Sequence, residues 1–74
     1  MITHWWNDHY RRGTLHRNEP SLTHKESMLG SVYEDDDGWY YNVVEGNTTV
    51  GPHRNADRAR RALEAAVGAE ALID

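Results

Sequence analysis

The 74-residue chain is long enough for one domain, contains no cysteine and carries a formal net charge of −4. The missing cysteines exclude a disulfide framework and every thiolate metal site, and a domain of this size buries only about 60% of the surface that its unfolded chain exposes. No stretch reaches the length of a membrane span, and no basic flank precedes an apolar run at the N-terminus, so we expect a cytoplasmic protein that does not enter membranes.

The first 30 residues show no sustained period of apolar side chains. Gly13, Pro20 and Gly30 interrupt each run, which favours an irregular N-terminal segment. An extra edge strand at Ile2 to Trp6 and one or two helical turns at Ser21 to Met28 are the alternatives. Ser21-Leu22-Thr23-His24, at the start of these helical turns, lacks the glutamate of a full capping box.

Two β-prone runs follow, joined by an acidic turn. Ser31 to Glu34 is the first, and it leads into Asp37-Gly38, a pair that favours a tight hairpin turn. Trp39 to Glu45 is the second, because it is rich in aromatic and β-branched residues. The alternation of side chains along the second run predicts one apolar face, made of Trp39, Tyr41 and Val43.

A third short strand is expected at 48–50, after a turn at Gly46-Asn47. A two-residue turn at this place predicts that Val43 lies opposite Val50. That register adds Val50 to the apolar face of the preceding strand, so the three strands form a meander with one face toward the core.

A helix is predicted from Ala56 to Val67. Asn55 is a suitable N-cap, Asp57 lies in the first turn where the helix dipole favours an acid, and Gly68 is a suitable C-terminal stop. Asp57 and Arg61 are spaced i,i+4 and predict a surface ion pair. The apolar residues at three- and four-residue spacing form a narrow stripe that can lie close on the sheet.

These elements predict an α+β fold with a three-stranded antiparallel meander packed by one C-terminal helix. Residues 31–74 form this part of a single domain, and residues 1–30 precede it as the irregular segment. We also expect 69–74 to add a final turn, with Leu72 and Ile73 touching the core or a partner.

The layout of residues 31–67 resembles the small sheet-plus-helix modules of phage and mobile-element proteins. The resemblance depends on Gly38-Trp39-Tyr40-Tyr41-Asn42-Val43-Val44, Gly46, Val50-Gly51-Pro52 and the alanine-rich helix. Arm-binding domains of tyrosine integrases and AP2-like domains share this layout, and there the exposed sheet face reads DNA. The resemblance implies a phage or prophage origin. Those strands carry many Lys and Arg residues, whereas residues 31–53 of this chain carry none.

Acidic and aromatic residues predict a protein-binding surface. The acids are concentrated in the middle of the chain, and aromatic side chains dominate interface hot spots. We therefore expect a small non-enzymatic inhibitor or modulator that binds a basic protein surface, by analogy with anti-CRISPR proteins. The predicted binding residues are Glu34, Asp35, Asp36, Asp37, Glu45, Trp39, Tyr40, Trp5 and Trp6.

Nucleic acid is the alternative partner, because basic residues cluster at the start of the helix and near residue 11. This interpretation makes the protein a DNA-binding module like the integrase arm domains. Its predicted contacts are Arg54, Arg58, Arg60, Arg61, Arg11 and Arg12. A second alternative is a structural homodimer.

The sequence predicts no enzymatic activity, cofactor or metal site. It contains no nucleophile motif or glycine-rich phosphate loop, and the Asp35-Asp36-Asp37-Gly38 run lacks the spaced ligands of a calcium loop. The five histidines include no i,i+4 pair of the kind that binds zinc on a helix. They can still make binding or association sensitive to pH near 6.5.

Overall fold

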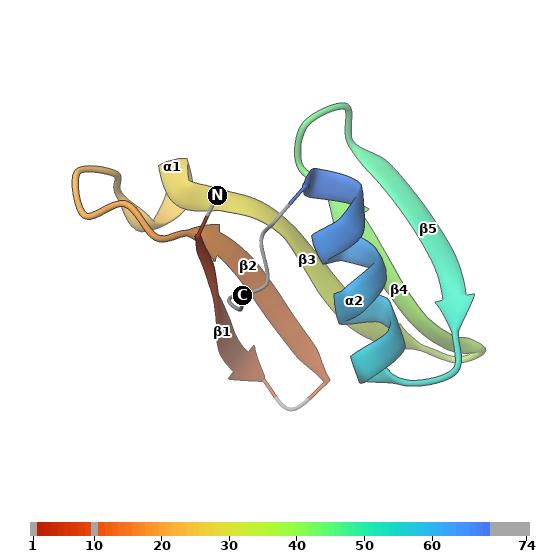
Figure 1. Cartoon of the computed structure of the whole chain (residues 1–74). Coiled ribbons are helices and arrows are strands. Elements are labelled where there is room, and N and C mark those ends of the chain that lie inside the picture. The colour runs from red at the N-terminus through yellow and green to blue at the C-terminus, as the bar shows by residue number, and fades with distance from the viewer. Residues whose placement is uncertain (1, 10, 69–74) are drawn as a thin grey trace.

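One antiparallel sheet carries a helix on one of its faces, an α+β arrangement (Figure 1). The computed structural model describes residues 2–9 and 11–68. Its five strands are neighbours in chain order within a single sheet. The elements are β1 Thr3–His9, β2 Arg12–Arg17, α1 His24–Ser27, β3 Met28–Asp35, β4 Gly38–Val43, β5 Thr48–His53 and α2 Ala56–Val67.

The predicted three-stranded meander was wrong, because the sheet has five strands. The N-terminal segment, expected to be irregular, contributes β1 and β2 as an antiparallel hairpin next to β3, followed by the short helix α1. Both strands are hard to recognise because register shifts interrupt their pairing, one between Trp6 and His9 and another after Leu15. A bulge breaks the alternation on which strand prediction depends.

The turns of the meander differ in detail from their prediction. Asp35 pairs with Gly38, so the first turn is centred one residue earlier than predicted. Val43 pairs with Thr48, and Tyr41 pairs with Val50, which shifts the predicted register by two residues. A two-residue shift leaves each side chain on its original face, so the predicted apolar face survives.

Helix α2 has the predicted bounds and ends. The Asn55 side chain accepts a hydrogen bond from the Arg58 N–H at 2.9 Å, and Gly68 closes the helix in the left-handed region at φ 70°. Arg61 and Asp57 form the predicted ion pair at 3.1 Å. No helix in the described part of the chain has the length and apolar character needed to cross a membrane. The final turn predicted for 69–74, with Leu72 and Ile73, lies outside the described residues.

The core lies between α2 and the central strands. Its fully or nearly fully buried members are Leu15, Val32, Tyr41, Ala59 and Leu63. Gly30 allows the helix to approach, because a Cβ there would lie 2.8 Å from Leu63 Cδ1 and would collide with the Asn42 carbonyl oxygen.

The N-terminal hairpin is also tied to α2. The Trp5 indole N–H donates to Glu64 at 2.8 Å, and Arg60 donates to the Asn7 side-chain oxygen at 2.9 Å. The Arg60 guanidinium lies 5.2 Å from the Trp5 ring centroid, a cation–π contact. These contacts hold β1 and β2 in the same layer as the meander, so the opposite face of all five strands forms one surface.

Candidate binding surface on the open face of the sheet

The face of the sheet opposite α2 is built from rows of side chains that follow the strand register. Residues directly opposite each other in antiparallel strands project to the same face. One complete row crosses all five strands and consists of Trp6, Thr14, Ser31, Asn42 and Thr49. The open face is therefore polar across its middle, with an indole at one edge.

An aromatic row lies beside this polar row. Arg12 is the direct partner of Tyr33, and Tyr33 is the direct partner of Tyr40. The two tyrosine rings stack with centroids 5.7 Å apart and an interplanar angle of 14°. Asp37 accepts hydrogen bonds from the Tyr40 hydroxyl, which raises the pKa of Tyr40 and fixes its ring. Arg12 is thus the strand neighbour of a stacked aromatic pair.

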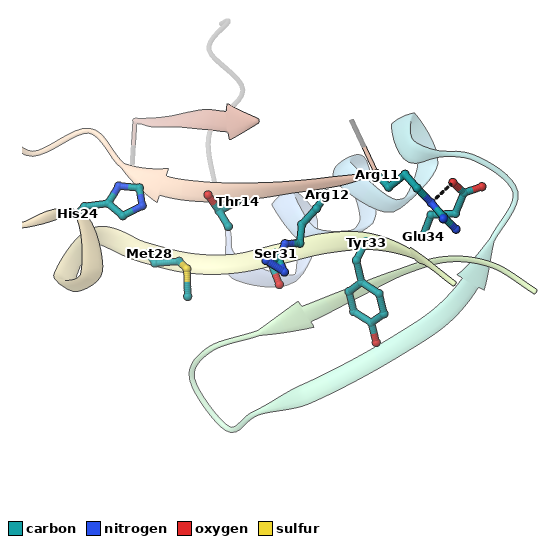
Figure 2. Close-up of a pocket in the computed structure, with 8 residues that line it drawn as sticks. All are labelled: Arg11, Arg12, Thr14, His24, Met28, Ser31, Tyr33 and Glu34. Carbon is teal, nitrogen blue, oxygen red and sulfur yellow. Dashed lines mark hydrogen bonds and ion pairs between the residues drawn. The ribbon is translucent and has the colours of Figure 1, made fainter. Parts of the chain in front are cut away.

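A broad groove of about 830 Å³ runs along β2 and β3 on this face. Figure 2 shows His24 at one end, the Arg11–Glu34 pair at the other, and Arg12, Ser31 and Tyr33 between them. Arg11 Nε donates to Glu34 at 3.1 Å. Among the described residues, neither the Arg12 guanidinium nor the Ser31 and Tyr33 hydroxyls have a hydrogen-bonding partner. As far as the described residues show, the groove therefore offers the Arg12 guanidinium and two hydroxyls to a ligand.

A cluster of imidazoles closes the α1 end of the groove. His16 is fully buried, and its ring centroid lies 4.2 Å from that of His24 and 5.7 Å from that of His4. Trp6 packs against the same cluster, with its ring centroid 4.3 Å from that of His24. Thr23 caps α1 and forms a full capping box with Glu26.

The hydrogen bonds of His16 determine which of its two ring nitrogens carries the proton in the neutral form. The Ser27 hydroxyl donates to the His24 carbonyl at 3.0 Å, so it can only accept from His16 Nδ1 at 2.9 Å. His16 Nε2 then accepts from the Thr14 hydroxyl at 2.9 Å. This direction is the reverse of a catalytic Ser–His pair, in which the imidazole takes the serine proton. The arrangement therefore ties α1 to β2 and does not activate Ser27.

Acidification is expected to destabilise the fold through His16. Burial, with smaller effects of His24 and His4, lowers the pKa of His16 from its usual 6.5. The unfolded chain then binds more protons than the folded chain below about pH 6.5, so the free energy of unfolding is at its full value above that pH and falls as the pH drops. In thermal denaturation, the melting temperature should fall as the pH is lowered from about 8 to about 5.5, in the wild type and in His53→Gln alike. A midpoint that stays constant over this range would contradict the burial of a neutral His16.

The structure separates the acidic residues of the predicted protein-binding surface. Glu34 and Asp35 end β3, Asp36 and Asp37 form the β3–β4 turn, and Glu45 lies in the turn at the other end of β4. The length of β4 puts about 20 Å between the two turns.

The predicted aromatic anchors are divided between the two faces. Trp5 and Trp39 are half-buried against the core under α2. Trp6, which is 51% exposed, and Tyr40 lie on the open face.

The predicted basic residues also fall into separate groups. Arg60 is committed to Asn7 and Trp5, and Arg61 to Asp57, on or beside the helix that covers the other face. Arg54 and Arg58 are exposed near the start of that helix. Arg11 and Arg12 alone line the groove.

Several groove residues were absent from the sequence prediction. Thr14, His24, Met28 and Ser31 line the groove, and Tyr33 does so beside Tyr40. One sequence signal for this region was available, since Thr23-His24-Lys25-Glu26 matches a capping box when it is started two residues later than Ser21.

In the described part of the chain, no group of three or more His, Cys, Asp or Glu residues is placed to hold a metal ion. Comparison with known proteins finds no matching family model, no similar curated protein and no similar solved structure.

Proposed function

We propose that the protein is a non-enzymatic binding module that takes up single-stranded nucleic acid on the open face of its sheet. The observation that carries this proposal is the groove in which Arg12 lies beside the stacked Tyr33–Tyr40 pair. Proteins that bind single strands combine aromatic rings for the bases with cations for the phosphates. Both components occur here on adjacent strands.

The local charge supports this partner although the whole chain is acidic. The groove lining contains Arg11 and Arg12 against one carboxylate, that of Glu34. The hydroxyls of Ser31 and Tyr33 add neutral hydrogen-bonding groups, which suit sugar and phosphate oxygens. An anion therefore meets a locally favourable surface in the groove.

A single strand suits the surface better than a duplex. Bases in a duplex are stacked on one another, so the faces that could pack on Tyr33, Tyr40 or Trp6 are covered. Unpaired bases expose these faces.

The proposal is tested by fluorescence anisotropy with a labelled single-stranded oligothymidylate and a labelled duplex of equal length. With Arg12 as the phosphate contact, log K should fall with log salt at a slope of about −0.7. Affinity for the single strand should then fall about two- to threefold between about 50 and 200 mM salt. We expect micromolar binding at the lower salt and a preference for the single strand.

Absence of binding to the single strand at low salt would overturn the proposal. Equal or tighter binding to the duplex would also contradict an aromatic stacking surface. It would favour the arginines at the start of α2 as the contact, which Arg58→Gln would then identify.

A basic protein surface is the second candidate partner, because Asp35, Asp36 and Asp37 are three consecutive exposed acids at one end of the sheet. Acidic patches speed the encounter with basic partners and make it salt-dependent. Titration with an arginine-rich peptide should then show binding that is lost when the three acids are replaced by asparagine. Binding that survives this replacement would exclude the acidic turn as the contact.

A further inference from the structure

His24 is held in place at the end of the groove. Its ring packs between Trp6 and His16, at centroid distances of 4.3 and 4.2 Å. Its carbonyl accepts the Ser27 hydroxyl at 3.0 Å, and Thr23 caps the helix from which it projects. The side chain is nevertheless exposed and lines the groove (Figure 2). An exposed imidazole is thus preorganised beside Thr14 and Met28.

The carboxylates that face His24 are already engaged. From the loop after β2, Glu19 lines a neighbouring hollow with His24 and pairs with Arg17 at 3.6 Å. Within α1, the Glu26 carboxylate accepts the Thr23 N–H at 3.0 Å.

The other groups around His24 carry no fixed negative charge. β2 contributes His16 and, further along the groove, Arg12, while β1 contributes His4 behind His16. Met28 of β3 is uncharged, and Lys25 of α1 is a cation. A protonated His24 would therefore find its negatively charged partner on a ligand.

We propose that His24 is a proton-dependent phosphate contact of the groove, so that affinity for single-stranded nucleic acid rises as the solution is acidified toward about pH 6. The inference rests on the proposed function. A histidine ring gains its positive charge near pH 6.5, and an imidazolium donates a charge-assisted hydrogen bond to a phosphate oxygen. Burial lowers the pKa of the neighbouring His16 from its usual value, so this ring favours its neutral form.

The test measures binding of the labelled oligothymidylate at constant ionic strength between about pH 8 and 6. The wild type should bind roughly three- to tenfold more tightly at the lower pH, since the extra free energy of a hydrogen bond to a charged group corresponds to an affinity difference of about that factor. His24→Gln keeps a polar planar side chain without the charge and should flatten the profile. His53→Gln is the matched control, because His53 packs on Tyr41 and hydrogen-bonds to the Trp39 carbonyl, outside the groove lining. It should retain the wild-type profile.

The outcomes separate the two proposals. Binding that does not depend on pH, or a pH profile that is unchanged in His24→Gln, overturns the role of His24 and leaves the proposed function standing. Binding that weakens on acidification, with circular dichroism showing that the fold is intact at each pH, also overturns it. Absence of binding at every pH overturns the proposed function, and the inference falls with it.

Discussion

Leu63→Ala is expected to lower the free energy of unfolding by about 3 kcal/mol, within the 2–5 kcal/mol typical of buried leucines. Leu63 is fully buried, and it packs where Gly30 lets α2 approach the sheet. In a domain of this size each 1 kcal/mol shifts the melting temperature by about 4–8 °C, so thermal denaturation followed by circular dichroism should show a loss of roughly 10–25 °C.

Val44→Ala provides the comparison for Leu63→Ala. Val44 is 46% exposed and lies in the turn after β4, so its truncation should change stability by less than about 0.5 kcal/mol. If Leu63→Ala were as mild as Val44→Ala, α2 would not be docked on the sheet through this residue.

The helix was predictable because its signals are local. Asn55, Asp57 and Gly68 act on backbone groups within one turn of themselves, and the structure places its ends at the predicted residues. The apolar face of β4 was predictable for a similar reason, since alternation along one strand is visible in the sequence. Register depends on the partner strand, which is why it was shifted by two residues while the faces were kept.

β1 was predicted only as an alternative, the edge strand at Ile2 to Trp6, and β2 was not predicted at all. The two faces of these strands do not differ as a simple core–solvent alternation requires. In β2, the core face offers Gly13 and Leu15, and the opposite face offers Thr14 and a buried His16. In a sequence pattern, His16 counts as a polar, solvent-facing residue. In the structure, Ser27, Thr14 and the neighbouring rings shield it completely from solvent. Its burial depends on α1 and β1, which lie elsewhere in the chain.

The groove was missed for the same physical reason. Arg12, Ser31 and Tyr33 come from two strands that pair across a segment containing α1, and no local motif connects them. Charge counted along the chain pointed to the acidic middle third, whereas the strand rows place Arg12 next to Tyr33, with Asp37 bound to the hydroxyl of Tyr40 on the other side of the pair. The sign of the charge on a surface depends on which strands the fold brings together, so it cannot be read from one sequence segment.

Tyr33→Ala is expected to weaken binding of the single-stranded oligothymidylate by about 5- to 150-fold, because base–aromatic stacking contributes about 1–3 kcal/mol per base. Tyr33 is the central residue of its row, with Arg12 on one side and the stacked Tyr40 on the other. Its removal takes away one stacking ring and the support of the second. Anisotropy titrations at low salt measure the loss.

Two further variants of Tyr33 separate stacking from its other roles. Tyr33→Phe keeps the ring and should retain most of the affinity, whereas Tyr33→Leu keeps an apolar side chain on the strand without a π-face and should resemble Tyr33→Ala. Melting temperatures of all three variants show whether the fold persists. Equal binding by the leucine and phenylalanine variants would remove stacking from the explanation and leave charge at Arg12 as the basis of affinity. Weaker binding by Tyr33→Leu than by Tyr33→Phe would show that the ligand has an aromatic face, which a nucleobase supplies.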